Sequence, residues 1–421
     1  MPWNRPTPRL PCTRREFFRT ASGGIGLLAF SRFAPAFLVS SALADAPAPE
    51  KDRSILVLVQ LAGGNDGLNT LVPFADDLYY RLRPTLGISR AEALPVSDTL
   101  GLHPGCGALR DLFHEGRLGI VQNVGYPNPN RSHFRSTEIW ETASGSNEFL
   151  GTGWIGRYLD NTCAGSPGGS HDPLAVHVNT PNGVPETFLG DAPHPTFGMM
   201  AGGVGRGGSD QTRRLLERDI GNPDAGGGDA LGFLRHTLMD ALVTETKVHD
   251  MLGSYRPQAS YPGNPFGMSL RNIAALIAAG LPTRVYFVTL GGFDTHVNQA
   301  ATQARLLATL SEGLAAFQRD LAAHGLDGQV LTMTFSEFGR RPGENDSKGT
   351  DHGTAAPLFV MGSRVRGGLH GKPPSLDIPR NQDIAFSADF RSVYATVLEG
   401  WLGCPSAPVL GGRFPGIPVL A

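Results

Sequence analysis

The chain contains, at residues 54–61, the near-continuous apolar run Ser54-Ile55-Leu56-Val57-Leu58-Val59-Gln60-Leu61, which stops at the breaker cluster Ala62-Gly63-Gly64-Asn65-Asp66-Gly67. A run of this length and composition is typical of a central parallel strand that is buried on both faces. The glycines and the Asn-Asp pair then end the strand in a turn. The stretch therefore predicts a sheet with both faces covered.

Four more apolar runs of strand length follow, at 118–124, 284–290, 330–335 and 357–361. Between the runs at 284–290 and 330–335, residues 299–324 place Leu306, Leu310 and Phe317 at helical spacing. Strand, helix, strand is the βαβ signature, so we predict an α/β fold with a mostly parallel central sheet flanked by helices. Helical patterns are also present at 132–142, 230–252 and 269–279.

The composition limits both function and domain organisation. Lys plus Arg number 36 and Asp plus Glu 38, for a net charge of −2, so the chain has no electrostatic footprint for nucleic acid. Gly 55 and Pro 33 together make about a fifth of the 421 residues, which indicates long loops. We predict a single α/β domain over 45–421, in which the Gly-rich stretch at about 164–230 is an insertion or lid; disorder is the alternative.

The first 44 residues are predicted to be an export signal. Thr13-Arg14-Arg15-Glu16-Phe17-Phe18 looks like a twin-arginine box, and Ala42-Leu43-Ala44 supplies a cleavage site after a mildly apolar stretch. The alternative is a membrane anchor, but about ten apolar residues are too few to span a bilayer. We therefore expect the twin-arginine export machinery as a partner, no stable membrane span, and a periplasmic or extracellular destination.

Polar clusters follow the predicted strands at the ends where ligands gather in parallel sheets. Asp294 and His296 stand two residues apart on extended chain and point to the same side, and with His352 they make a set suited to a catalytic Zn²⁺ with an open position. Asp66 and Glu337 offer a second, all-carboxylate set, and two ions about 3.5–4 Å apart stabilise attacking and leaving oxygens in an ester displacement. Turn chemistry or N-capping by Asp294 is the alternative for that motif.

Ser132 stands at the start of the predicted helix 132–142. One interpretation is an N-cap. The other is a nucleophile whose alkoxide is stabilised by a metal and by the helix N-terminus. His133 beside it is either a general acid or an ordinary exposed or core histidine.

These motifs together resemble the secreted bacterial family called domain of unknown function 1501. The resemblance rests on the segments Gly63-Gly64-Asn65-Asp66-Gly67, Arg131-Ser132-His133-Phe134, Gly292-Phe293-Asp294-Thr295-His296, Ser336-Glu337-Phe338-Gly339-Arg340 and Thr350-Asp351-His352-Gly353. That family is similar in turn to the alkaline phosphatase and sulfatase superfamily. The similarity implies an alkaline-phosphatase-like α/β fold and a bimetal site built from strand-end Asp, Glu and His.

The resemblance also implies roles for particular residues. Asp66 would match the first-strand metal ligand and Ser132 the nucleophile. Asp294 and His296 would be the ligands of one metal, and His352 would match the superfamily's late histidine. Glu337 falls where the superfamily has an Asp-His pair, and Phe338 stands in place of that histidine. The second metal is therefore one ligand short unless Asp351 or His133 supplies it.

The sequence thus predicts an exported metal-dependent hydrolase acting on a phosphate, sulfate or related ester, either a small molecule or a polymer. The cofactor is a divalent metal, with Zn²⁺ favoured over Mn²⁺, Mg²⁺ or Ca²⁺, and Arg340 or Arg131 would clamp the anionic group. The alternative is a non-catalytic exported binding or assembly protein that retains the fold with a degenerate metal site.

Replacing Arg14 and Arg15 together by lysine should leave unprocessed protein in the cytoplasm, because paired guanidinium groups are the recognised feature and lysine does not reproduce them. Fractionation and immunoblotting of an exporting host check this. Normal processing of the double variant would assign the protein to another export route.

Overall fold

The structure, a computed structural model, describes residues 53–163, 172–203, 244–379 and 382–421. These residues form a nine-stranded sheet in the order β13-β5-β12-β9-β1-β8-β6-β7, with β14 paired to β5. Only β12 runs antiparallel to its neighbours, so the mostly parallel sheet is confirmed. The strands are β1 Ile55–Ala62, β5 Leu118–Gly125, β6 Ala175–Val178, β7 Thr196–Met199, β8 Val285–Gly291, β9 Val330–Phe335, β12 Ala356–Met361, β13 Gly368–His370 and β14 Ala388–Asp389.

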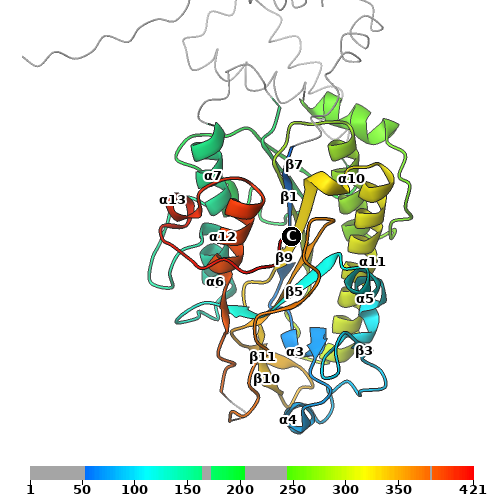
Figure 1. The fold of residues 1–421 in the computed structure, drawn as a ribbon, viewed down its shortest axis with the longest axis vertical. Coiled ribbons are helices and arrows are strands. Elements are labelled where there is room, and N and C mark those ends of the chain that lie inside the picture. Colours follow the sequence, from blue (N-terminus) through cyan, green and yellow to red (C-terminus); the bar gives the residue numbers. More distant parts are fainter. Residues whose placement is uncertain (1–52, 164–171, 204–243, 380–381) are drawn as a thin grey trace, which may run out of the picture. The chain divides into compact units, whose positions relative to one another are not determined.

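Helices cover both faces of this sheet (Figure 1). One face carries α5 Gly107–His114, α10 Pro265–Ala278 and α11 Gln299–Ala323. The other carries α6 His133–Thr142, α7 Trp154–Cys163, α12 Phe390–Gly400 and α13 Ser406–Leu410. The result is a three-layer α/β/α arrangement.

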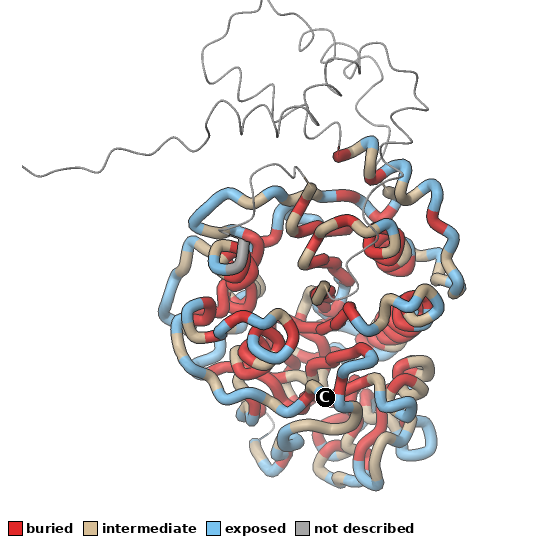
Figure 2. Tube along the Cα trace, turned by 45° about the horizontal axis from the view of Figure 1, so that its top comes forward, coloured by how far each residue is buried: buried red, intermediate tan, exposed pale blue. Residues whose placement is uncertain are grey.

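The side chains of β1 explain why its sequence is apolar at almost every position. Ile55, Val57 and Val59 pack with the α5, α10 and α11 layer. Leu56 and Leu58 point to the opposite layer. All five are at most 1% exposed, and Figure 2 shows the buried residues along the sheet and the inner faces of the helices. A strand buried on both faces needs apolar residues on both.

The predicted βαβ unit is present. Strands β8 and β9 both pair in parallel with β1, on its two sides, and α11 connects them. The five predicted strands correspond to β1, β5, β8, β9 and β12.

The prediction of an insertion at 164–230 needs correction in its middle part. Strands β6 and β7 lie there, and they extend the central sheet from the edge of β8. Each has four residues, too few to give a clear apolar pattern. Residues 164–171 and 204–230 lie outside the described residues, as do the predicted signal at 1–44 and the first part of the predicted helix 230–252. None of the helices in the described part of the chain is both long and apolar enough to cross a bilayer.

Smaller elements surround the carboxyl end of β1. They comprise a three-stranded sheet (β2 Leu71–Val72, β3 Leu94–Pro95, β4 Gly101–Leu102), the short helices α3 Gly67–Thr70 and α4 Asp77–Leu82, and the hairpin of β10 Arg340–Glu344 with β11 Thr350–His352. The described residues also include a helical stretch at 244–254 and three 3₁₀ turns: η1 Pro104–Cys106, η2 Glu186–Phe188 and η3 Asp327–Gln329.

A buried ion pair fastens these elements together. The guanidinium of Arg83 binds both carboxylate oxygens of Asp66 at 2.5 and 2.8 Å, and its Nε donates to the carbonyl of Pro342 at 2.9 Å. The side chains of both charged residues are fully buried. Gln299 of α11 donates a further hydrogen bond to Asp66. A buried charge pair is tolerated only when its remaining hydrogen-bonding groups are satisfied, as they are here.

Replacing Arg83 by alanine should lower the free energy of unfolding by about 3–5 kcal/mol, because it leaves the carboxylate of Asp66 buried without its counter-ion. Urea denaturation measures this. The matched control is Arg110→Ala, which breaks the half-exposed pair with Asp111 and should cost no more than about 1 kcal/mol. Equal small losses would contradict the assignment of Arg83 as a buried anchor.

Candidate metal centre

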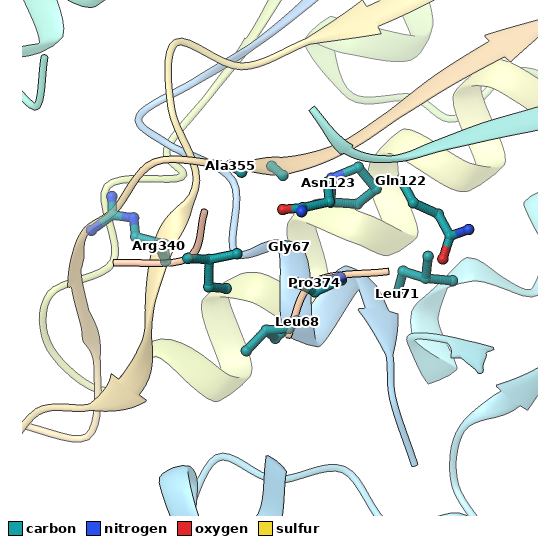
Figure 3. Close-up of a pocket in the computed structure, with 11 residues that line it drawn as sticks. Gly67, Leu68, Leu71, Gln122, Asn123, Arg340, Ala355 and Pro374 are labelled. Atoms are coloured by element: carbon teal, nitrogen blue, oxygen red, sulfur yellow. The ribbon is translucent and has the colours of Figure 1, made fainter. Parts of the chain in front are cut away.

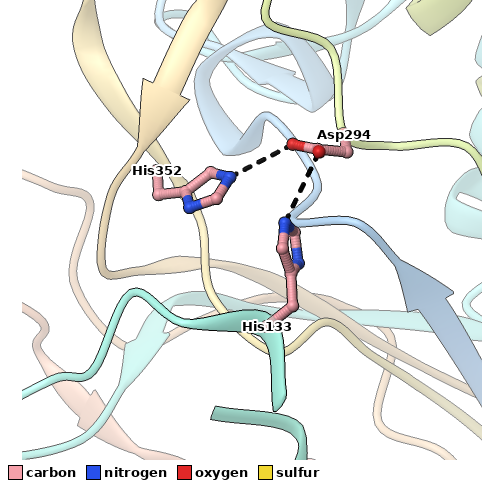
Figure 4. A group of neighbouring side chains, drawn as sticks. All are labelled: His133, Asp294 and His352. Carbon is pink, nitrogen blue, oxygen red and sulfur yellow. Dashed lines mark hydrogen bonds and ion pairs between the residues drawn. The ribbon is translucent and has the colours of Figure 1, made fainter. Parts of the chain in front are cut away.

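The segments that follow β1, β8 and β9 meet the start of α6 and the end of β11 at one end of the sheet. The carboxylate of Asp294 lies at the centre of this meeting point. Its Oδ1 is 3.0 Å from Nε2 of His296 and 3.1 Å from Nε2 of His352. Its Oδ2 is 3.5 Å from Nε2 of His133, so three imidazoles surround one carboxylate. Figure 4 shows two of them, those of His133 and His352, beside Asp294.

Each of these imidazoles is held from behind through its other nitrogen. The Nδ1 of His133 lies 2.8 Å from Glu337, that of His296 lies 3.4 Å from Asp351, and that of His352 lies 2.8 Å from the carbonyl of Arg131. Ionised carboxylates and carbonyls only accept hydrogen bonds, so each Nδ1 carries its proton. In the neutral ring Nε2 then presents a lone pair towards Asp294. Metal-binding histidines are oriented in this way.

The lone pairs need a cation between them. Nε2 of His296 and Nε2 of His352 are 2.9 Å apart, so two neutral rings with protonated Nδ1 would repel each other. A proton shared between the rings or a metal ion removes the repulsion. Oδ1 of Asp294 completes a triangle of ligand atoms with edges of 2.9, 3.0 and 3.1 Å. This donor set of nitrogen and oxygen suits Zn²⁺, which binds histidine at about 2.0–2.1 Å.

His133 is the candidate ligand whose role the sequence left open. With Asp294 and His352 it offers ligand atoms that all lie within 4.8 Å of one another. Its ring packs beside Phe338, with centroids 4.9 Å apart, and its bond to Glu337 raises its pKa. Of the two substitutes considered for the histidine absent at Phe338, His133 reaches the cluster directly, while Asp351 lies behind His296. The available signal was its place next to Ser132 at the start of a helix.

The predicted all-carboxylate set of Asp66 and Glu337 does not come together. Asp66 is held by Arg83 and Gln299 away from the histidines. Glu337 is 2% exposed and accepts from the backbone N–H of Gly63 at 2.8 Å as well as orienting His133. The physical reason is that buried carboxylates take the donors nearest to them. Glu337 therefore contacts the centre through its hydrogen bond to His133, whereas the sequence predicted it as a direct metal ligand.

The prediction that Arg340 clamps an anionic ester group is also corrected. Its guanidinium donates to the carbonyls of Gly63, Gly64, Phe293 and Thr350 and, at 2.7 Å, to Oδ1 of Asp294. It is 2% exposed, so no face remains for a substrate.

Arg340 instead acts on the central carboxylate. Burial tends to raise the pKa of Asp294, but the contacts of its carboxylate with Arg340 and His352 outweigh burial and lower that pKa to about 2. The other candidate clamp, Arg131, has a 44% exposed side chain that pairs with Asp383 at 3.3 Å.

Ser132 occupies the N-cap position of α6, but its side chain makes no capping hydrogen bond. The serine is exposed, and its neighbours on both sides touch the cluster: the Arg131 carbonyl through His352, and the His133 ring through Asp294. Ser132 therefore lies between two residues that both contact the cluster, and its hydroxyl makes no capping hydrogen bond to the helix. Its role as a nucleophile stays a prediction.

The family model described as "Protein of unknown function (DUF1501)" matches residues 53–390. The chain belongs to this family. No curated protein matches the sequence. The segments that carry the DUF1501 resemblance are those that build the cluster around Asp294.

Solved structures similar to this DUF1501 chain include a protein of the alkaline phosphatase superfamily from Vibrio parahaemolyticus, with 12% identity, coverage of 87% of this chain and 71% of that one, and a TM-score of 0.37. The C-terminal periplasmic domain of EcEptC from Escherichia coli, in complex with Zn, has 9% identity, 75% coverage of each chain and a TM-score of 0.35. Alkaline phosphatase from the Antarctic bacterium TAB5 has 10% identity, 74% and 92% coverage and a TM-score of 0.29. Similarity at this level carries no information about chemistry, which rests on the site itself.

Cavities of different size lie near the cluster in the DUF1501 chain. A cleft of about 540 Å³ opens beside it, lined by residues of β1, β8, α6 and the segment 180–186, and including His133, Asp294 and Glu337. A cavity of only about 20 Å³ lies between Gln122, Leu68 and Pro374 (Figure 3). The amide oxygen of Gln122 has no hydrogen-bond partner there, and the volume suits one water molecule. The larger cleft is therefore the candidate substrate site.

The purified mature protein should carry at least one equivalent of a divalent transition metal, and His352→Ala should lose it and melt at a lower temperature, because a ligand that binds only the native state stabilises that state. Elemental analysis and thermal unfolding measure this. The matched control is His114→Ala, an exposed histidine at the end of α5. Metal-free wild type with no thermal shift on adding Zn²⁺ or Mn²⁺ would rule out the centre.

Proposed function

We propose that this DUF1501 chain is an exported metal-dependent hydrolase of a phosphate, sulfate or related ester. The observation that supports the proposal is the convergence of three Nε2 atoms on Asp294, with each Nδ1 held by an acceptor. Such an arrangement serves a bound cation, and two of its residues, His133 and Asp294, line a cleft large enough for a substrate. The twin-arginine box at 13–18 supports export.

The residues that would hold the ion are His133, His296, His352 and Asp294. When bound, a divalent metal polarises an ester oxygen and stabilises an alkoxide nucleophile. The chain itself contributes orientation. Glu337, Asp351 and the Arg131 carbonyl fix the rings, and Arg340 fixes the carboxylate.

Ser132 is the proposed nucleophile. Its Oγ would form a bond to the phosphorus or sulfur of the ester as the alcohol leaves, and water would then hydrolyse the intermediate. Because its hydroxyl makes no capping bond, it is free to turn towards the ion. Because Arg340 is buried among carbonyls, the metal and the N-terminus of α6 would bind the negatively charged ester group instead.

A non-catalytic binding or assembly role is the second candidate. One observation favours it: Ser132 is not among the residues that line the cleft. In that case the metal would have a structural or ligand-binding role, and Ser132 would be an ordinary exposed serine.

Replacing Ser132 by alanine should abolish turnover of any active ester while leaving metal content unchanged and the free energy of unfolding within about 0.5 kcal/mol, because the hydroxyl contributes no hydrogen bond to the helix. Asp294→Ala should remove both activity and metal. A panel of phosphate, phosphonate and sulfate esters assayed with elemental analysis measures both.

The control for the serine is Ser363→Ala, another exposed serine. Silence of wild type on the whole panel, with the metal in place, would favour the binding role.

A further inference from the structure

A buried amide in the cleft beside the metal centre lacks part of its hydrogen bonding. Gln60 of β1 and Thr289 of β8 are paired in the sheet, and both line the cleft. Gln60 is 8% exposed and Thr289 is 4% exposed. The hydroxyl of Thr289 donates to Oε1 of Gln60 at 3.1 Å, whereas Nε2 of Gln60 makes no hydrogen bond within the described part of the chain. Two N–H groups are therefore left without a protein acceptor.

The surroundings of Gln60 in the sheet direct these N–H groups to the cleft. Leu56, Leu58 and Gln60 alternate onto the same face of β1, the one that the α6 layer covers. On one side of Gln60 the register places Thr289, whose hydroxyl proton is already donated to Oε1. On the other side it places Phe335, whose ring has no hydrogen-bonding atom. Since Gln60 lines the cleft, its N–H groups are available to a ligand there.

A ligand hydroxyl fits both members of this pair. It can accept a hydrogen bond from Nε2 of Gln60 and donate one to Oγ1 of Thr289, whose own proton goes to Oε1. The three groups then bond to one another in a ring. A methyl group in the same place leaves both protein groups unpaired, and a carbonyl oxygen leaves Thr289 without a donor. Burying an unpaired donor costs free energy, so the site discriminates in favour of a hydroxyl.

The pair lies a short way along β1 from the metal centre. Ala62 and Gly63, which follow Gln60, also line the cleft. The backbone N–H of Gly63 donates at 2.8 Å to Oε1 of Glu337, and the same oxygen lies 2.8 Å from Nδ1 of His133. Two residues of a strand span about 7 Å, so several bonds separate a group at Gln60 from an ester group at the metal.

The remaining lining of the cleft suits an uncharged, hydroxylated ligand. It includes the carboxylates of Glu138, Glu141 and Glu186 and, among the described lining residues, no lysine or arginine. Carboxylates accept hydrogen bonds from hydroxyl groups and repel anions. Beyond the ester group itself, a neutral chain with hydroxyl groups therefore matches the cleft better than a chain with a second negative charge.

We infer that Gln60 and Thr289 form a hydroxyl-binding subsite, so that the cleft takes esters of polyols. The ester group lies at the metal centre, and a further hydroxyl of the alcohol part lies between Nε2 of Gln60 and Oγ1 of Thr289. This inference rests on the proposed function, because the metal centre has to bind the ester group. Gln60 and Thr289 then determine specificity without touching the reacting atoms.

The test measures by calorimetry how tightly non-hydrolysable phosphonates bind the metal-loaded mature protein. The probes are ω-hydroxyalkylphosphonates with three to six carbons, each compared with the alkylphosphonate in which a methyl group replaces the hydroxyl. At the chain length that spans the distance from the metal to Gln60, the hydroxyl compound should bind about tenfold tighter than its methyl counterpart. The reason is that the methyl compound leaves Nε2 desolvated without an acceptor.

Two variants assign this preference to the subsite. Gln60→Met should reduce the affinity ratio to about one, because the thioether fills similar space without the N–H groups. Thr289→Val should reduce the ratio about threefold, because it removes the acceptor for the hydroxyl proton of the ligand. Metal content should stay that of wild type in both variants. If Gln60→Met does not fold, Thr289→Val, which conserves the shape of the side chain, decides the comparison.

Gln318→Met is the matched control. Gln318 of α11 is 1% exposed and donates to Oγ1 of Thr332 at 3.1 Å, so the two form a similar buried glutamine–threonine pair. This pair lies on the face of the sheet that α11 covers, opposite to the face of Gln60. The control variant should therefore keep the full preference for the hydroxyl compound.

The outcomes separate the subsite from the proposed function. Metal-dependent binding with equal affinity for every hydroxyl and methyl pair would overturn the subsite and leave the ester function standing. A preference that persists after metal removal, and that Gln60→Met abolishes, would support the subsite and contradict the role of the metal in binding the ester. If no phosphonate binds with or without metal, both proposals fail. A loss of preference in Gln318→Met as large as in Gln60→Met would overturn the subsite, because the effect would then come from packing.

Discussion

The guanidinium of Arg340 is the contact on which the candidate site depends. It accepts no hydrogen bonds and donates to carbonyls from three segments, those of Gly63 and Gly64 after β1, Phe293 after β8, and Thr350 of β11, and to the carboxylate of Asp294. The loops need unusual backbones to come this close. Gly63 has a φ of +120°, and a Cβ there would lie 2.3 Å from the backbone nitrogen of Asp294. The buried guanidinium of Arg340 thus binds segments that are distant in sequence and also binds the carboxylate of Asp294 that lies between them.

The sequence predicted the parts of the site that depend on local geometry. Asp294 and His296 share a side because two residues on extended chain do so. His352 joins them from the β10–β11 hairpin, where it pairs with Arg340. The fold was predictable for the same reason: β1 is apolar at nearly every position because both its faces are covered.

Roles that depend on a remote partner were not predictable in the same way. Arg83, which lies outside the central sheet, forms an ion pair with Asp66, and the ring of His133 forms a hydrogen bond with Glu337. The side chain of Arg340 turns inward because four carbonyls and the carboxylate of Asp294, rather than a ligand, accept its hydrogen bonds. Spacing in the sequence predicts that a carboxylate lies at the end of a strand. It does not predict which of several hydrogen-bond donors will bind that carboxylate in the fold. A short strand such as β6 could not be predicted, because four residues are too few to show a clear apolar pattern.

Net charge conceals how charge is distributed over the molecule. A value of −2 rules out a general attraction to polyanions, yet the walls of one cleft carry carboxylates without a matching lysine or arginine among the described lining residues.

The pairing of β1 has a consequence for the order of events during folding. Leu56 pairs with Val285 on one side and with Leu331 on the other, so the innermost strand waits for partners synthesised much later. Non-local pairing of this kind is slow, because the chain loses the entropy of closing a long loop before the pairing contacts form and stabilise the structure. The histidines converge only after both partners have docked, so an ion held by them would not nucleate the fold as it does in a zinc finger. Such an ion would therefore be one that is available in the compartment where the whole chain has finished folding.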